Sequence, residues 1–382
     1  MKKIFIISLV LLIVVMVFLG IYNIAFKKSE EPVIREADQK EQIKKTMPAA
    51  EVGVIKSEKI TAISSIEVVG AVFDKKNDAI LYYSAKDGTT WKSDPNGKNI
   101  MQTSQTKVLG IKNVLWSPDK SKVLTTVEKE GKLVFYEYDT IAQKAVELKN
   151  GLDTAVWDNM GAKILYKYFD QTTKIRTLNI ANPDGSDWQK ITDIDFRNIS
   201  ISRIPLTSLV SFWNYPLADA ETQLMSVGVA VGDEPRTIFK GKFGADYSWS
   251  PNGSLALISS LNEKDGKKIT LGTVNLKGEY NDLNIPTVVS KAVWSSDSKI
   301  IYYAVAGGIP ETAIMPNDYY DGKFTTKDTF WKLDITTGKK ERLVEPEDVS
   351  AVYDANNLFL SPTEDTLYFI NKIDGKLYKI AL

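Results

Sequence analysis

One short motif recurs along this chain and constrains its fold more than any other feature. Four times, a tryptophan and a turn precede an apolar, strand-like run, and looser copies extend the repeat at both ends. The copies centre on Phe73, Trp116, Trp157, Ser202, Trp249, Trp294 and Leu360, at successive intervals of 43, 41, 45, 47, 45 and 66 residues. A period of about 40 to 45 residues with strand-like content is typical of β-propeller blades and not of helical solenoids.

Turn signals divide each repeat into four short strands. In the fifth repeat, strand-like runs end at Trp249, cover 255–259 and cover 269–275, and a fourth run follows. The Asp265-Gly266 pair between the second and third runs is typical of a tight hairpin, in which glycine takes the positive φ. We therefore expect residues 57–382 to form an all-β, seven-bladed β-propeller of four-stranded antiparallel blades, with six or eight blades as the alternatives.

The recurring tryptophans have a structural interpretation. Trp116, Trp157, Trp249 and Trp294 end the first strand of their repeats. Since a blade has two apolar faces that its neighbours cover, we expect these side chains to pack between blades as repeat anchors. The Ser-Pro-Asp sequence after Trp116 is typical of a β-turn.

The two ends of the repeat region are expected to meet. Residues 377–382 match a third strand, which leaves the last blade without an outer one. Residues 59–64, just before the first repeat, match the fourth strands of other repeats. We predict that this segment completes the last blade.

The order of Trp-Ser-Pro-Asp, an apolar strand, Asp-Gly and a further strand resembles the repeats of the TolB-like, WD-type β-propeller family. The resemblance covers about residues 57–382, although the fourth repeat retains little of the motif. It implies the propeller fold. Propellers of this kind serve as docking platforms, sugar-active enzymes or peptidase lids, so the resemblance leaves the function open.

An apolar segment precedes the repeats. Residues 4–26 contain no charged side chain, and about 20 apolar residues suffice to cross a bilayer. We predict a single transmembrane signal-anchor helix within residues 1–26, followed by a charged, flexible linker over residues 27–56. A cleaved signal peptide is the alternative, because Lys2 and Lys3 precede the apolar run.

The sequence indicates the membrane orientation only weakly. Lys27 and Lys28 balance the two lysines on the other side of the predicted helix, which reduces the positive-inside bias. The free amino terminus and the acidic residues of the linker favour a cytoplasmic N-terminus. We therefore expect a single-pass membrane protein, held in the membrane through residues 4–26, whose propeller lies outside the cytoplasm, in the periplasm or at the cell surface.

The composition excludes several kinds of chemistry. The chain has no histidine and no cysteine, which removes Ser-His-Asp and Cys-His catalysis, Cys/His metal sites and disulfides. We expect no metal and no cofactor. The 48 basic and 48 acidic residues balance, so nucleic acid is not an expected partner.

Two loops are longer than the repeat requires. One lies in the fourth repeat, around residues 213–221, and the other covers 307–328 in the sixth, which accounts for the interval of 66 residues. Long loops on a rigid scaffold frequently carry function. The ligand-binding candidates, chosen for aromatic surface and hydrogen-bond acceptors, are Trp213, Tyr215, Glu311, Asp318, Tyr319, Tyr320 and Asp321. The alternative is that these side chains pack on their own scaffold.

Part of the longer loop also resembles a metal site. The spacing of Asn317, Asp318 and Asp321 is similar to that of calcium ligands. The complete calcium-binding loop pattern is missing, so we expect no metal there.

Two functional hypotheses remain. The first is a membrane-anchored scaffold that binds another protein or a cell-envelope glycan. The second is a carbohydrate-active hydrolase or lyase with paired carboxylates on the propeller face, a chemistry that needs neither histidine nor cysteine. No carboxylate pair stands out in the sequence, so the catalytic residues are unknown and a binding role is favoured over an enzyme.

Overall fold

The computed structural model describes residues 59–230 and 232–382. Contacts between Cα atoms divide the chain into two compact units, Met1–Lys56 and Ser57–Leu382. The predicted membrane helix and linker, residues 1–56, lie outside the described residues. Within residues 59–230 and 232–382, no helix combines the length and the apolar character needed to span a bilayer.

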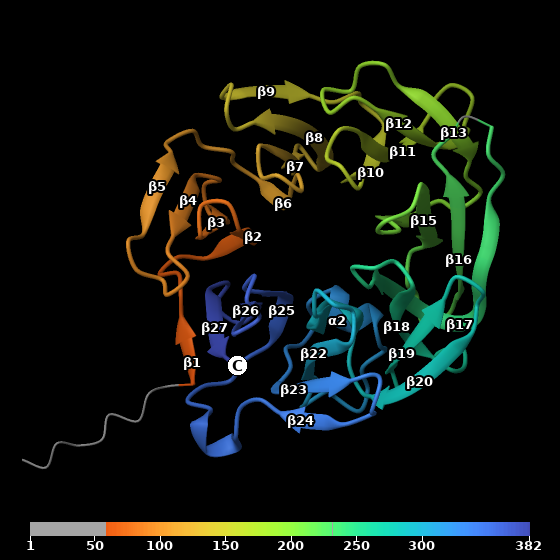
Figure 1. Ribbon diagram of the computed structural model, residues 1–382. Coiled ribbons are helices and arrows are strands. Elements are labelled where there is room, and N and C mark those ends of the chain that lie inside the picture. Colours follow the sequence, from red (N-terminus) through yellow and green to blue (C-terminus); the bar gives the residue numbers. More distant parts are fainter. Residues whose placement is uncertain (1–58, 231) are drawn as a thin grey trace, which may run out of the picture. The chain divides into compact units, whose positions relative to one another are not determined.

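Antiparallel sheets follow one another around a ring (Figure 1). Each of the first three sheets has four strands, paired in chain order. Their strands are β2 (Val68–Asp74), β3 (Ala79–Ser84), β4 (Thr90–Ser93) and β5 (Met101–Ser104); β6 (Ile111–Trp116), β7 (Lys122–Lys129), β8 (Lys132–Asp139) and β9 (Lys144–Glu147); and β10 (Leu152–Trp157), β11 (Ile164–Phe169), β12 (Arg176–Ala181) and β13 (Gln189–Asp193). The prediction of an all-β fold with four-stranded antiparallel sheets is confirmed.

The next seven strands form one continuous sheet. They are β14 (Ile199–Arg203), β15 (Leu209–Asn214), β16 (Glu221–Gly228), β17 (Arg236–Trp249), β18 (Leu255–Leu261), β19 (Thr270–Asn275) and β20 (Tyr280–Ile285). The long strand β17 pairs with β16 through its first half and with β18 through its second half. It therefore joins two four-stranded groups, β14 to β17 and β17 to β20.

The last two sheets hold the C-terminal strands and the first strand. One comprises β21 (Ala292–Trp294), β22 (Ile300–Val305), β23 (Thr329–Asp334) and β24 (Lys340–Arg342), and the other comprises β25 (Ala355–Leu360), β26 (Thr366–Asn371), β27 (Leu377–Ala381) and β1 (Ile60–Ala62). Ile60 of β1 pairs with Ile380 of β27, so the segment before the first repeat supplies the outer strand of the last sheet, as predicted. Short helices η1 (Val289–Lys291), α2 (Asn317–Tyr320) and η2 (Pro346–Asp348) lie in the connections.

Apolar side chains fill the spaces between neighbouring sheets. Successive residues of a strand point to opposite faces, so each sheet can bury residues against the sheet before it and the sheet after it. Between the second and third sheets, for example, Leu124 and Phe135 pack in one cluster with Trp157 and Ile164. These clusters hold the sheets together around the ring.

The four repeat tryptophans lie at these contacts between sheets. Each indole N–H donates a hydrogen bond to the preceding group of strands. The acceptors are Gly70 O for Trp116, Leu115 O for Trp157, Ser211 Oγ for Trp249 and Ser248 O for Trp294. Each tryptophan thus combines apolar burial with one directional bond between groups.

Candidate functional site

The two long loops lie at the same end of the sheets. Because neighbouring strands are antiparallel, loops between second and third strands share one end with the connections between successive groups. We call this end the upper face. It carries residues 215–220, between β15 and β16, and residues 306–328, between β22 and β23.

These two loops contact each other. The backbone N–H of Ala218 donates a hydrogen bond to Asn317 Oδ1 at 2.9 Å, although 99 residues separate them in sequence. Ala218 also shares a buried apolar cluster with Met315 and Tyr319. We call residues 215–220 and 306–328 together the loop platform.

Asp246, at the start of the second half of β17, lies beneath the loop platform. Its Oδ1 accepts from Trp213 Nε1 at 3.0 Å and from Tyr247 N at 3.1 Å, and its Oδ2 accepts from the Tyr320 hydroxyl at 3.1 Å. Among the described residues, no lysine or arginine forms an ion pair with it. Burial raises the pKa of Asp246, although the hydrogen bonds from Trp213 and Tyr320 oppose that shift.

Several loop side chains are exposed to solvent. Tyr215 is 42% exposed, Leu217 38% and Ile314 51%. Glu311 and Asp321 are also exposed. The loop platform therefore combines a fixed backbone with accessible aromatic, aliphatic and acidic groups.

Other predicted ligand-binding residues serve the fold of the loop. Tyr319 is only 1% exposed, and its hydroxyl donates to Asp354 Oδ1 at 2.7 Å. Asp318 accepts from the backbone N–H of Ile314 and forms an ion pair with Lys323 at 2.6 Å. Trp213 is buried against Tyr247, at a ring-centroid distance of 5.2 Å. These three side chains therefore fix the loops and do not form their outer surface.

A buried ion cluster lies between the last two sheets. Lys291 Nζ lies 2.6 Å from Asp328 Oδ2 and 2.6 Å from Asp354 Oδ1, and all three side chains are 0% exposed. The second oxygen of Asp328 accepts from the Thr326 hydroxyl. Every charge in the cluster is thus paired within the protein.

The two carboxyl groups of this cluster differ in acidity. Burial raises the pKa of Asp328 above its usual value, despite the neighbouring Lys291 ammonium. Burial acts in the same direction on Asp354, but Lys291 and the hydrogen bond from Tyr319 outweigh it and lower the pKa of Asp354. Asp354 is therefore the more acidic of the two, although each carboxylate accepts one hydroxyl hydrogen bond.

These buried charges were not predicted from the sequence. Asp246 and Lys291 each stand three residues before a repeat tryptophan, Trp249 and Trp294, and the same position holds Asn113 before Trp116 and Thr154 before Trp157. Because a polar residue recurs at this position, the sequence did not distinguish the two buried charges.

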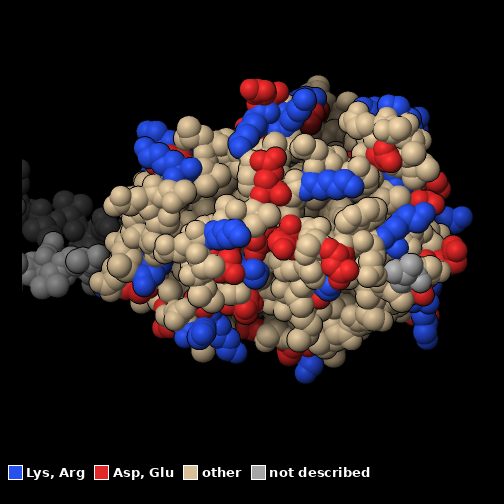
Figure 2. Space-filling model, turned by 90° about the horizontal axis from the view of Figure 1, so that it is seen from above, with Lys and Arg blue, Asp and Glu red and all other residues tan. Residues whose placement is uncertain are grey.

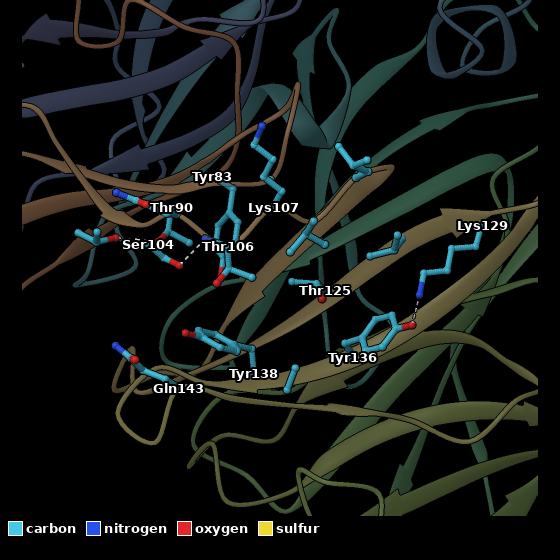
Figure 3. A pocket seen from close by; sticks show the side chains of 17 residues that line it. Tyr83, Thr90, Ser104, Thr106, Lys107, Thr125, Lys129, Tyr136, Tyr138 and Gln143 are labelled. Atoms are coloured by element: carbon cyan, nitrogen blue, oxygen red, sulfur yellow. Dashed lines mark hydrogen bonds between the residues drawn. The ribbon is translucent and has the colours of Figure 1, made fainter.

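A second candidate site is a cavity of about 750 Å³ between the first two sheets. Its walls include Tyr83 of β3, Thr90 of β4, and Thr125 and Tyr138 of β7 and β8 (Figure 3). The sequence did not predict it, because its residues stand in the strands of two different repeats and in the connection between them, residues 105–109.

The surface charges are mixed. Figure 2 shows basic and acidic side chains interspersed on the side of the molecule that it presents. No broad area of one sign stands out in that view. This distribution accords with the equal numbers of acidic and basic residues in the chain.

No family model and no curated protein matches the sequence. Many solved structures are similar in fold, among them the following three. An oligogalacturonate lyase in complex with manganese matches with a TM-score of 0.61 and 14% identity, over 85% of this chain and 93% of that chain. An oligogalacturonate lyase from Vibrio parahaemolyticus matches with a TM-score of 0.58 and 13% identity, over 84% and 93%. The β-propeller domain of Myceliophteria thermophila Cps50 (Swd1) matches with a TM-score of 0.53 and 11% identity, over 85% and 99%.

The manganese of the first of these structures raises the question of whether this chain could bind such an ion. The chain has no histidine, and residues 59–230 and 232–382 hold no group of three or more acidic side chains placed to bind a metal. The described residues therefore offer no ligand set for manganese. At these identities the similarity shows the fold alone: residues 59–382 are similar to β-propellers. The resemblance to TolB-like repeats is supported as far as the propeller fold.

Proposed function

We propose that this protein is a membrane-anchored, seven-bladed β-propeller that lies outside the cytoplasm and binds another protein through its loop platform. Seven blades result when β17 is counted in both of the four-stranded groups that it joins. The uncharged run of residues 4–26 supports the membrane anchor. The observation that carries the binding role is the contact between the two loops, which holds exposed Tyr215, Leu217 and Ile314 on one fixed surface.

The chemistry of this surface suits a protein partner. Exposed aromatic and aliphatic side chains with charged residues around them are typical of protein interfaces. Asp219 and Asp321 are exposed beside the apolar residues. Since the bond from Ala218 to Asn317 already orders the loops, binding would require little further loss of conformational entropy.

The alternative, a carbohydrate-active hydrolase or lyase, has less support. A pair of catalytic carboxylates must reach the substrate. Asp328 and Asp354 form such a pair near the upper face, but both are fully buried and bound to Lys291. Asp246 is hydrogen-bonded by Trp213, Tyr247 and Tyr320, and the side chains of Trp213 and Tyr320 cover it.

Site-specific photo-crosslinking in native membranes tests the binding role. A photoreactive residue would replace Leu217 or Ile314 in the full chain, with Met160 as the control. Met160 is 81% exposed, in the turn between β10 and β11 at the opposite end of the sheets. We expect the same protein to be captured from positions 217 and 314 and not from 160. Tyr215→Ala should then weaken its binding by about tenfold or more.

Two outcomes would contradict the proposal. One is equal capture from all three positions, which indicates non-specific contact. The other is reproducible cleavage of a glycan by the purified full chain, which would favour the enzyme hypothesis.

A further inference from the structure

We propose that the cavity between the first two sheets, β2–β5 and β6–β9, binds a short, uncharged oligosaccharide. This site is separate from the loop platform, which lies on later sheets, so the proposal stands independently of the protein-binding role. Its basis is the combination of a large opening between sheets with walls that carry many hydroxyl and amide groups and no carboxylate, beside two lysines and several apolar side chains.

The opening exists because apolar side chains do not fill this contact between sheets. The buried apolar cluster here contains only Tyr83, Ile111, Val114 and Val123. The cluster between the last two sheets has eleven buried members. The remaining space of about 750 Å³ falls within the usual range of small-ligand pockets, about 300 to 1,000 Å³.

The wall of the cavity carries many hydroxyl groups and no carboxylate. Thr90 and Thr103 come from the first sheet, and Thr125, Tyr136 and Tyr138 from the second. Because no aspartate or glutamate lines the cavity, a cationic ligand would find no counter-charge there. A sugar presents hydroxyls that donate and accept hydrogen bonds, which are the complement of such a wall.

Two tyrosine hydroxyls in this wall have unused hydrogen-bonding capacity. Tyr83, which is 3% exposed, and Tyr138 both line the cavity, and neither hydroxyl bonds another described residue. Neither belongs to the fully buried, unpartnered side-chain atoms of the described residues, so each can exchange a contact with solvent for one with a ligand. In Figure 3 both side chains reach toward the same part of the cavity. Burial and the neighbouring Tyr138 raise the pKa of Tyr83, so this hydroxyl stays neutral and can donate.

The positive charges near the cavity do not favour an anionic ligand. Lys129 Nζ bonds the Tyr136 hydroxyl, which in turn donates to Glu147 Oε2 at 2.7 Å. In Figure 3 the ammonium of Lys107 points away from the tyrosines. One lysine is therefore already engaged and the other is directed elsewhere, which leaves the neutral hydroxyls to face the ligand.

The strands β7 and β8 of the cavity wall offer no edge to an added peptide strand. β7 is paired with β6 on one side and β8 on the other, and β8 is paired with β7 and β9. Recognition on these two strands must therefore use side chains, as Thr125 and Tyr136 can from opposite positions. The edge strands β5 and β9 also line the cavity, and a peptide that extends a sheet needs such an edge, so peptides are included among the probes below.

Calorimetry and a glycan array with the full chain in detergent test the proposal. The probes are maltotriose, cellotriose and chitotriose as neutral trisaccharides, trigalacturonate as an acidic one, and a tripeptide library. We expect saturable binding of at least one neutral glycan and weaker or no binding of trigalacturonate. Tyr138→Phe and Thr125→Val should each weaken that binding about five- to tenfold, because each removes one hydroxyl. Tyr215→Phe, on the loop platform, is the control and should not change it.

Three results would overturn the proposal: no neutral glycan binds, only trigalacturonate or peptides bind, or neither hydroxyl variant changes the affinity. If Thr125→Val lowers the melting temperature, Gln143→Ala replaces it, since Gln143 also lines the cavity. Crosslinking from position 217 should be the same in Tyr138→Phe as in the unchanged protein. A result against glycan binding in the cavity is therefore distinguishable from a result against protein binding at the loop platform.

Discussion

Lys291 Nζ lies 2.6 Å from Asp354 Oδ1, and this fully buried ion pair joins the last two sheets. Lys291 ends the short helix η1 before β21, and Asp354 directly precedes β25. The Tyr319 hydroxyl bonds the same carboxylate oxygen. The cluster therefore connects two sheets and the longer loop of the platform through one polar centre.

Replacing the buried cation should destabilise the protein strongly. In Lys291→Met, the carboxylates of Asp328 and Asp354 would remain buried without a positive partner, so we expect the free energy of unfolding to fall by about 3–5 kcal/mol. Chemical denaturation of the full chain in detergent measures this change. The control is Lys299→Met, since Lys299 is exposed and lies 3.8 Å from Asp297. That variant should change stability by less than about 1 kcal/mol, and similar losses in the two variants would contradict the prediction.

The raised pKa of Asp246 predicts that removing its charge by substitution stabilises the protein in a pH-dependent way. Burial raises its pKa, so the charged form costs stability once the pH is above the ordinary value of 3.8, and protonation relieves that cost as the pH falls. Asp246→Asn should therefore raise the melting temperature at pH 7, and this advantage should shrink as the pH falls through the raised pKa. Thermal melts across a pH series measure it.

Asp119 is the control, because its pKa is shifted in the opposite direction. Hydrogen bonds from Ser117 and Ser121 lower the pKa of Asp119 to about 2. Its charged form therefore stabilises the fold above pH 3.8, and that contribution is lost between 3.8 and about 2. Asp119→Asn should lower the melting temperature at pH 7. A change of melting temperature in the same direction in Asp246→Asn and Asp119→Asn would refute the opposite pKa shifts assigned to these two residues.

The closing strand β1 should contribute to the stability of the whole ring. Ile60 is 2% exposed and lies in the cluster between the last two sheets. Ile60→Ala should reduce the free energy of unfolding by about 2–4 kcal/mol, because it leaves a cavity in that cluster. Ala62→Ser, at an exposed position of the same strand, is the control. An unchanged denaturation midpoint in Ile60→Ala would show that the ring is stable without this strand.

The contact between the two loops should matter for binding more than for folding. Asn317→Ala removes the acceptor of the Ala218 N–H, so the loops would lose their mutual order. We expect capture from position 217 to fall several-fold while the melting temperature changes little. Thr312→Ala, on the exposed part of the same loop, should leave capture unchanged. If Asn317→Ala and the unchanged protein capture the partner equally, binding does not depend on the contact between the two loops.

The sequence was sufficient to predict the repeat and its closure, because those signals are local. Alternating apolar residues and turn pairs such as Asp265-Gly266 indicate strands and hairpins within one repeat. The fusion of two groups through β17 was not predicted. Gly241 and Gly244 lie within that strand and resemble breaks in the sequence, whereas the structure carries both on one continuous strand.

The site was only partly predictable, because exposure depends on distant partners. Tyr215 and Tyr319 look equivalent in sequence, yet Tyr319 is buried since Asp354 lies in reach of its hydroxyl. The cavity exists because no side chain fills the space between Tyr83 and Thr125, which belong to different repeats. The sequence of either repeat alone does not indicate that a space separates the residue from the neighbouring sheet.

The strand that closes the ring also determines how the molecule would respond to force. Ile60, Thr61 and Ala62 of β1 are paired with β27, and the N–H of Ile63 donates to Leu377 O directly after them. Tension applied at residue 59 would act first on these few hydrogen-bonded pairs. Peeling β1 away would uncover the edge of β27 and loosen the junction between the last sheet and the first. Force on β1 and opening of the ring are therefore coupled mechanically through one short strand.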